Sequence, residues 1–268
     1  MNPRTLLFLA VAGAFVIATS PTALAASSMS MPSTSTHGLG KPLPLGWEPA
    51  VHDGPINTLT LFEKSEFRTG DAPDAVVFDA QGWIGGDYRR FWWKAEGEQE
   101  TKGAKAGEFE VQGLYSRLVS PFWDFQTGVR IDRQYRGRMH ATTAYFVLGL
   151  EGLAQYWFEV EPVLFVSEKG KVSFRLTASY DQLITQRLVL QPRIDLNAAF
   201  QNDPKRNLAA GLNDVELGLR LRYDLSRQFS PYVGVAWRRV LGGTAGLARR
   251  SGEDISTTSI MFGLRIWF

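Results

Sequence analysis

The sequence predicts an all-β protein: a transmembrane antiparallel up-and-down β-barrel of about 12 strands that follows a disordered periplasmic N-terminal tail. Three observations predict this fold. Apolar and polar residues alternate along most of the chain, a secretory signal stands at the N-terminus, and the last segment, residues 260–268, alternates strictly and ends on Phe268. Successive side chains of a strand point to opposite faces. The apolar face of these strands is therefore expected to contact lipid and the polar face to line the lumen.

Residues 1–25 have the features of a signal peptide. Arg4 precedes an apolar run over residues 6–18, which is shorter than the roughly 20 residues that span a hydrocarbon core. Ala23-Leu24-Ala25 supplies a small-x-small cleavage pattern, so the mature chain is expected to start near Ala26. A single membrane-anchoring helix is the alternative interpretation of the run.

The rest of the chain divides into two parts. Residues 26–55 are rich in Ser, Thr, Pro and Gly without periodicity, which predicts a flexible periplasmic tail. Residues 56–268 form the predicted barrel. The chain has no cysteine and a formal net charge of +2, which excludes disulfides and a lipid-anchored start and gives no argument for nucleic acid. Aromatic residues at 12% mixed with charged residues at 21% are typical of alternating lipid-facing and lumen-facing positions.

Period-2 segments separated by turn signals predict the strands. They are expected near residues 57–67, 76–85, 88–98, 108–118, 122–132, 142–152, 156–166, 171–181, 187–200, 213–225, 231–240 and 258–268. The alternation is clearest in 213–225 and 171–181 and least regular in 57–67. Short connections fall at every second junction and the longer stretches 99–107, 133–141, 201–212 and 241–257 fall between them, which predicts periplasmic turns, outer loops and both termini in the periplasm.

Aromatic residues beside the short connections predict a girdle at the inner membrane interface. They are Tyr88, Phe122, Trp123, Tyr156, Phe229, Tyr232 and Phe268. The terminal phenylalanine also resembles the signal by which outer-membrane barrel proteins are recognised for insertion.

Long ordered strings carry a family resemblance. They are FDAQGWIGGDYRRFWWKAEGE from Phe78, QGLYSRLVSPFWDFQTGVR from Gln112, LGLEGLAQYWFEVEPVLFV from Leu148, TQRLVLQPRIDLNAAFQNDP from Thr185, and GLNDVELGLRLRYDL through SPYVGVAWRR. From about His52 to Phe268 the chain is similar to the copper resistance protein B family of outer-membrane proteins. The resemblance implies copper tolerance: an outer-membrane component that binds or passes copper beside a periplasmic multicopper oxidase and copper-binding proteins.

The chain departs from that family in its tail. Family members commonly carry a Met- and His-rich segment after the signal, since thioether sulfur suits Cu(I) and imidazole suits Cu(II). Here only Met29, Met31, His37 and His52 remain. They could gather around one Cu(I) in a weak, transient site, or they are ordinary residues of a solvated tail.

The predicted barrel has few further soft donors. Met139 and His140 adjoin each other in the expected outer loop 133–141 and could start a copper site, although one loop histidine is more often only exposed. Met261 is expected to face inward on the last strand, where it could equally fill a gap.

Carboxylates are expected on the inward faces near the short turns. They are Asp124, Glu151, Glu159, Asp181 and Asp224, with Glu161 one layer further in. Such a ring attracts cations, and Glu159 and Glu161 are the candidate metal ligands among them. Basic residues are expected on the same faces: Arg90, Lys94, Arg130, Arg175, Arg193, Arg220, Arg222, Arg238 and Arg265. In a narrow barrel these would pair with the acids and form a polar plug; a conducting cation path is the alternative.

Arginines in the outer loops predict contact with membrane lipid and lipopolysaccharide phosphate. They are Arg133, Arg136, Arg138, Arg249 and Arg250. No enzyme is expected, because no Ser-His arrangement on neighbouring strands can be built from His37, His52 and His140. Three hypotheses remain: a barrel that binds or passes copper, a narrow channel for another small cation or solute, and a plugged structural barrel.

Overall fold

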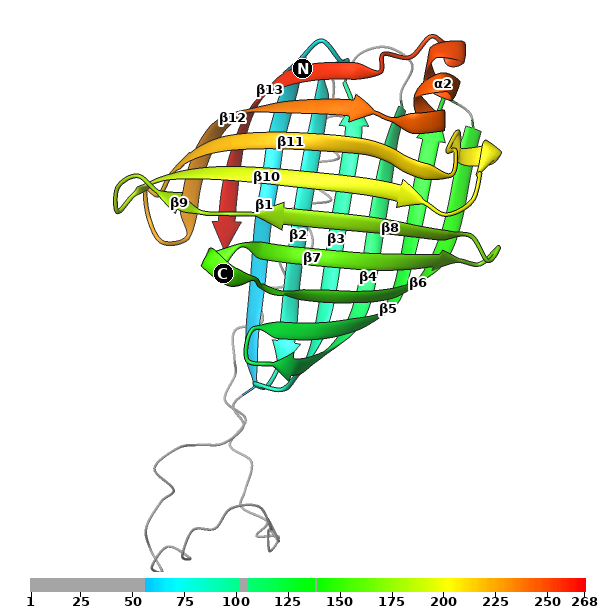
Figure 1. Ribbon diagram of the computed structural model, residues 1–268. Coiled ribbons are helices and arrows are strands. Elements are labelled where there is room, and N and C mark those ends of the chain that lie inside the picture. The colour runs from blue at the N-terminus through cyan, green and yellow to red at the C-terminus, as the bar shows by residue number, and fades with distance from the viewer. Residues whose placement is uncertain (1–55, 102–105, 138) are drawn as a thin grey trace, which may run out of the picture. The chain divides into compact units, whose positions relative to one another are not determined.

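The computed structural model describes residues 56–101, 106–137 and 139–268, which form one closed antiparallel β-barrel (Figure 1). The predicted signal peptide and tail lie outside the described residues. The strands are β1 (Asn57–Gly70), β2 (Ala75–Gly85), β3 (Arg89–Glu100), β4 (Ala106–Ser120), β5 (Trp123–Arg136), β6 (Met139–Leu153), β7 (Glu159–Ser167), β8 (Val172–Ser179), β9 (Gln182–Leu183), β10 (Leu188–Ala199), β11 (Gly211–Tyr223), β12 (Phe229–Val240) and β13 (Ser256–Trp267). Apart from β8 and β9, which both pair with β10, each strand pairs with its neighbour along the chain, and β1 pairs with β13 to close the ring.

The ring has 12 strand positions, because β8 and β9 are two pieces of one strand beside β10. The interruption lies opposite Pro192 of β10. The backbone N–H of Tyr180 donates to the Pro192 carbonyl at 3.2 Å, but proline has no N–H with which to complete the pair. The predicted 12-stranded barrel is therefore confirmed, with one local break at a proline.

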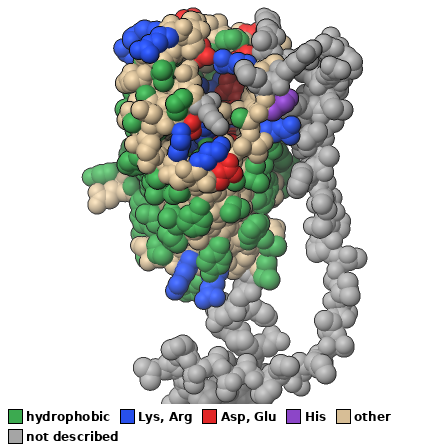
Figure 2. All heavy atoms as spheres, turned by 90° about the vertical axis from the view of Figure 1, so that its right-hand side faces the viewer, with side chains coloured by type: hydrophobic (Ala, Val, Ile, Leu, Met, Phe, Trp, Pro, Cys, Tyr) green, Lys and Arg blue, Asp and Glu red, His purple; other side chains and the backbone are tan. Residues whose placement is uncertain are grey.

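The apolar face of the sheet is its outer face. In β13 the side chains of Ile260 and Phe262 are 50% and 52% exposed, whereas Met261 between them is fully buried. In β11, Leu217, Leu219 and Leu221 are exposed while Arg220 is buried. On the face shown in Figure 2, hydrophobic side chains gather in a belt across the barrel, with charged side chains above and below it. This is the pattern of a transmembrane barrel.

Strand β1 contains a β-bulge that explains its irregular sequence pattern. The pairing register shifts between Phe62 and Lys64 toward β2 and between Phe62 and Ser65 toward β13. A bulge adds one residue to a strand and re-aims a side chain. Glu63 and Lys64 consequently both make ion pairs inside the barrel, with Arg193 and Asp79.

The barrel has two different ends. The turn end carries the connections 86–88, 121–122, 154–158, 184–187 and 224–228 and also both ends of the described chain. The connection 154–158 contains the 3-10 turn η1 (Gln155–Trp157). The loop end carries 71–74, 101–105, 137–138, 168–171, 200–210 and 241–255. Two of the predicted long loops, 201–212 and 241–257, match the two longest connections of this end.

The predicted outer loop 133–141 is wrong. Strands β5 and β6 stay paired up to Arg136 and Met139, which leaves only the turn 137–138. Gly137 has a φ of 62°, which lets the chain reverse tightly.

The loop end also holds helical structure that the sequence pattern did not predict. Helix α2 (Gly242–Ser251) ends at Gly252, whose left-handed backbone, with φ 73°, lets its N–H contact the carbonyls of Ala248 and Arg249. The connection 200–210 contains the 3-10 turn η2 (Pro204–Arg206). Among the described residues, no helix is long and apolar enough to cross a membrane.

Most of the predicted girdle aromatics lie exposed at the turn end. Tyr88, Phe122, Tyr156 and Phe268 are 59–80% exposed. The prediction that Tyr232 belongs to the girdle is wrong, because this residue is only 5% exposed and lies inside the barrel. Strand β12 turns Ser230 and Tyr232 inward and Val233 outward, so the tyrosine faces the charged residues of the lumen.

Candidate functional site

The lumen is filled by an apolar cluster on one side and by ion pairs elsewhere. The apolar cluster consists of Trp92, Leu114, Tyr145, Val147, Val163 and Phe165, all inward-facing on β3 to β7. The sequence pattern did not predict this cluster, since the alternation was expected to place apolar residues outside and polar residues inside. The guanidinium of Arg130 lies 4.3 Å from the ring centre of Phe165, and so joins the cluster to the charged part of the lumen.

Lys94 of β3 connects two distant strands. Its ammonium contacts Glu151 of β6 at 3.0 Å and also Glu161 of β7, and its side chain is only 5% exposed. Gln126 donates a further hydrogen bond to Glu151 at 2.7 Å. Because three strands separate β3 from β7 in the ring, this contact spans part of the lumen.

Arg193 of β10 makes a second crossing contact. Its guanidinium lies 3.1 Å from Glu63 on the β1 bulge and 2.9 Å from Asp195 on its own strand. The hydroxyl of Thr177 donates to Asp195 at 2.7 Å. The bulge in β1 therefore supplies the acid that Arg193 reaches across the barrel.

Glu66 is the most completely enclosed acid of this network. Its side chain has no exposed area and contacts Arg68 at 2.7 Å and Arg220 at 3.4 Å. The hydroxyl of Tyr232 donates to it at 2.8 Å. Arg68 in turn contacts Glu216 at 3.0 Å, so the cluster links β1, β11 and β12.

Near the loop end, charged side chains and a loop close the barrel together. Glu110 contacts Arg130 at 2.8 Å and Arg175 at 3.0 Å, so that β4, β5 and β8 are joined. Arg206, from the connection 200–210, contacts Asp132 at 3.1 Å and also the hydroxyl of Tyr145. This loop thus places a guanidinium inside the mouth.

The same loop is fixed from outside. Lys171 contacts Asp203 at 2.8 Å, and the backbone N–H of Ala209 donates to the hydroxyl of Thr244 on α2 at 3.0 Å. Thr244 also accepts from Asn213 at 2.7 Å. The loop 200–210 and helix α2 therefore form one hydrogen-bonded cover over part of the loop end.

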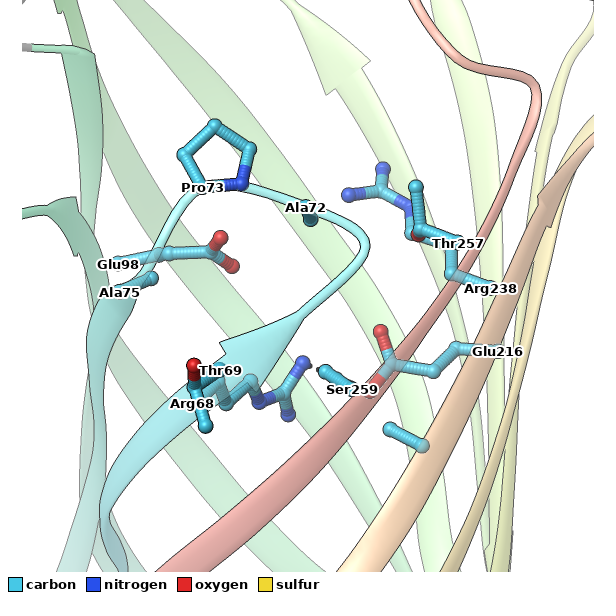
Figure 3. Close-up of a pocket in the computed structure, with 11 residues that line it drawn as sticks. Arg68, Thr69, Ala72, Pro73, Ala75, Glu98, Glu216, Arg238, Thr257 and Ser259 are labelled. Carbon is cyan, nitrogen blue, oxygen red and sulfur yellow. Dashed lines mark ion pairs between the residues drawn. The ribbon is translucent and has the colours of Figure 1, made fainter. Parts of the chain in front are cut away.

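A cavity of about 70 Å³ remains at the loop end, between β1, β2 and β11 to β13 (Figure 3). Arg68 and Glu216 face each other at its base, and Glu98 and Arg238 stand on opposite walls. The hydroxyls of Thr69, Thr257 and Ser259 complete the polar lining. The space suits a few water molecules. Its oxygen donors are hard ligands and two guanidinium groups offset their charge, so the cavity offers nothing that selects copper.

The structure separates the predicted soft donors from one another. Met29, Met31, His37 and His52 lie outside the described residues. His140 is exposed on β6, opposite Tyr135 of β5, and it does not lie in a loop as predicted. Met139 is the first residue of the same strand.

Met261 lies inside the barrel as predicted and is fully buried. Its register partners are Arg68 on β1 and Gly234 on β12. Its methyl carbon occupies the space beside Gly218, 3.9 Å from where a Cβ on that glycine would stand. A neighbouring guanidinium disfavours a bound cation, so these surroundings favour the packing role of the thioether over the ligand role.

The candidate acids Glu159 and Glu161 have different surroundings. Glu161 is held by Lys94. Glu159 is exposed and accepts a hydrogen bond from the hydroxyl of Ser179 at 3.4 Å. The pair is therefore not one site.

The other acids of the predicted ring are neutralised by arginine or lysine. Arg90 contacts Asp124 at 3.5 Å, and Arg222 contacts Asp181 at 2.8 Å and Asp224 at 3.1 Å. Within the described part of the chain, no group of three or more His, Cys, Asp and Glu side chains is arranged to hold a metal ion. The geometry favours the plug over a preformed metal site.

Comparison with known proteins agrees with the sequence resemblance. The family model for the copper resistance protein B precursor (CopB) matches residues 56–268. Copper resistance protein B of Escherichia coli is 42% identical over 82% of this chain and 72% of its own length. The copper resistance protein B homolog of Pseudomonas syringae pv. tomato is 42% identical over 81% and 72%.

Solved structures with a similar fold are more distant. The KdgM porin has a TM-score of 0.48 and 10% identity over 78% of this chain and 98% of its own. Outer membrane phospholipase A from Escherichia coli has a TM-score of 0.46 and 13% identity over 78% and 92%. The family model covers the whole described barrel and both relatives match about four fifths of the chain, so the chain belongs to the copper resistance protein B family.

Proposed function

We propose that this protein serves copper resistance by binding copper ions at the ends of a barrel whose lumen is closed in its resting state. The family establishes the role in copper resistance. In this proposal the protein sits in the outer membrane of a Gram-negative bacterium, with the turn end in the periplasm. The copper ion is cargo, and its oxidation state stays open.

The crossing ion pairs carry this proposal. Lys94 to Glu161, Arg193 to Glu63 and Arg175 to Glu110 each join strands that do not neighbour each other in the ring. Together with the apolar cluster they occupy the lumen with side chains. An ion that crossed the resting barrel would have to break these contacts, whereas binding at a mouth leaves them intact.

Copper would reach the turn end through two kinds of donor. Met29, Met31, His37 and His52 of the tail offer soft sulfur and imidazole. Glu159 offers an exposed carboxylate without an ion pair to any described residue. With so few donors the binding is weak and transient, which suits delivery to or from a periplasmic multicopper oxidase and copper-binding proteins.

A gated copper path is the second candidate, and Arg206 favours it. A single side chain from a loop contacts Asp132 and Tyr145 inside the loop-end mouth. Withdrawal of that loop would open the mouth without unfolding a strand. Catalysis is not part of either proposal, because the family role requires none and His140 stands exposed on β6.

Copper titration of the purified, refolded protein tests the proposal. The mature chain and a variant lacking residues 26–55 are titrated by calorimetry, and both are inserted into planar bilayers for conductance. We expect copper binding that weakens without the tail, and no steady conductance. A steady cation conductance indifferent to copper would favour a general channel, and neither binding nor conductance would favour a structural barrel.

A further inference from the structure

Two arginines stand side by side on the outer surface of the barrel at the turn end. Arg89 of β3 and Arg117 of β4 are directly opposed in the pairing of these strands, and both are exposed. Their neighbours one step along the same face are Phe91 and Tyr115, which are 53% and 46% exposed and also directly opposed. The arginine pair therefore lies near the turn-end edge of the lipid-facing belt.

The next residue on β3 shows the contrast between the two faces. Arg90 points into the lumen and contacts Asp124 at 3.5 Å. Neither Arg89 nor Arg117 has an ion pair or side-chain hydrogen bond with any described residue. Like charges directly opposite each other on one face of a sheet repel. An anion between the two guanidinium groups would remove that repulsion.

The surroundings identify the kind of anion. Tyr88, which is 72% exposed, precedes Arg89 in the connection between β2 and β3. Val119 and Phe122, 58% and 59% exposed, follow Arg117 toward and within the connection between β4 and β5. Phe91 and Tyr115 continue toward the centre of the belt. Figure 2 shows Lys and Arg side chains directly below the hydrophobic belt. A ligand here has an anionic group level with the arginines and an apolar body along the belt.

We propose that Arg89 and Arg117 bind the phosphate of a phospholipid in the membrane leaflet at the turn end. Arginine forks match phosphate oxygens, and their charge-assisted hydrogen bonds are about twice as strong as neutral ones. The acyl chains lie along Phe91 and Tyr115, and Tyr88 sits at headgroup level. The site is independent of copper and lies at the end opposite the loop arginines predicted to meet lipopolysaccharide.

Native mass spectrometry tests the assignment. The mature protein is prepared in maltoside micelles, which carry no phosphate, and phosphatidylglycerol is added. A double variant, Arg89→Gln with Arg117→Gln, should hold the lipid roughly tenfold more weakly or worse, as expected when charge-assisted contacts to one phosphate are lost. The control variant, Lys169→Gln with Arg239→Gln, removes the same charge from exposed residues at the loop end and should bind the lipid like the natural chain.

A second measurement separates lipid from free phosphate. Phosphatidylglycerol should raise the unfolding temperature of the natural chain and of the control variant, read by the heat-dependent shift in gel migration, but not that of the double variant. Inorganic phosphate alone should have no such effect. Equal lipid retention by the natural chain and the double variant would overturn the proposal, as would an equal rise with inorganic phosphate.

Discussion

Replacement of Glu66 by Gln should destabilise the barrel more than the loss of any exposed acid. Glu66 has no exposed side-chain area and contacts Arg68, Arg220 and Tyr232. Glutamine keeps the shape but removes the charge. Arg68 would retain Glu216 at 3.0 Å, whereas among the described residues Arg220 forms an ion pair only with Glu66.

The magnitude follows from that difference. Removal of one partner from a buried pair costs about 3–5 kcal/mol, because the other charge stays buried and unpaired. The amide oxygen of glutamine can still accept one hydrogen bond, so we expect a loss of about 3 kcal/mol. The matched control is Glu253→Gln, which removes the partner of Arg136 in a pair whose side chains are 64% and 40% exposed. An exposed pair contributes about 0–1 kcal/mol.

Urea titration of the barrel folded into lipid vesicles measures both variants. The folded fraction is followed by tryptophan fluorescence and by heat-modifiable gel migration. The free energy of unfolding of the Glu66 variant should fall well below that of the Glu253 variant. Equal losses below about 1 kcal/mol would refute the reasoning, since they would mean that water or side-chain rearrangement neutralises Arg220.

Four further changes test other parts of the molecule. Glu161→Gln should cost about 1–2 kcal/mol of stability in the same urea titration, since Lys94 keeps Glu151, while Glu159→Gln should stay within about 0.5 kcal/mol; the reverse order would make Glu159 the structural acid. Arg206→Gln should raise cation conductance in planar bilayers relative to Arg249→Gln, and unchanged conductance would argue against the gated path. Joint replacement of Met29, Met31, His37 and His52 should lower copper binding only modestly in a titration, so a complete loss of binding would show that these donors suffice. Deletion of Phe268 should lower the amount of folded, heat-modifiable protein in membranes, because its backbone exchanges hydrogen bonds with Thr60 at 2.9 and 3.1 Å across the closing seam; unchanged levels would contradict both the seam and the insertion signal.

The sequence predicted the outer surface of the barrel better than its interior. Lipid requires an apolar side chain at nearly every outward position, so strands such as β11 and β13 show the alternation clearly. The interior of a narrow barrel accepts both apolar and polar groups. The alternation therefore does not indicate that Trp92 and Phe165 face inward. It also places Tyr232 in the girdle, whereas its hydroxyl donates a hydrogen bond to Glu66 inside the barrel.

Local irregularities account for the other differences. The bulge at Glu63 adds a residue to β1 and breaks the period of 2. The pattern therefore predicts neither the register of this strand nor the contact between Glu63 and Arg193. Arg206 lies in a connection, where no period exists to indicate that its side chain enters the mouth. The inward acids and bases themselves were predicted, but their pairing depends on which strands face each other across the ring, and that information is absent from any single strand.

The narrowness of the ring decides what its acids can do for copper. Arginine and lysine side chains reach across this lumen, as Arg193 does to Glu63 and Lys94 to Glu161. A tethered cation competes with a free ion at an effective concentration near the millimolar range or above. A copper ion at trace concentration would have to displace such a group before it could bind a luminal acid. Glu159, which is exposed at the turn end, needs no such displacement, but a lone carboxylate does not distinguish copper from other cations. If the protein selects copper, as we propose, the soft donors outside the lumen have to supply the selection: Met29, Met31, His37 and His52 of the tail together with Met139 and His140 of β6.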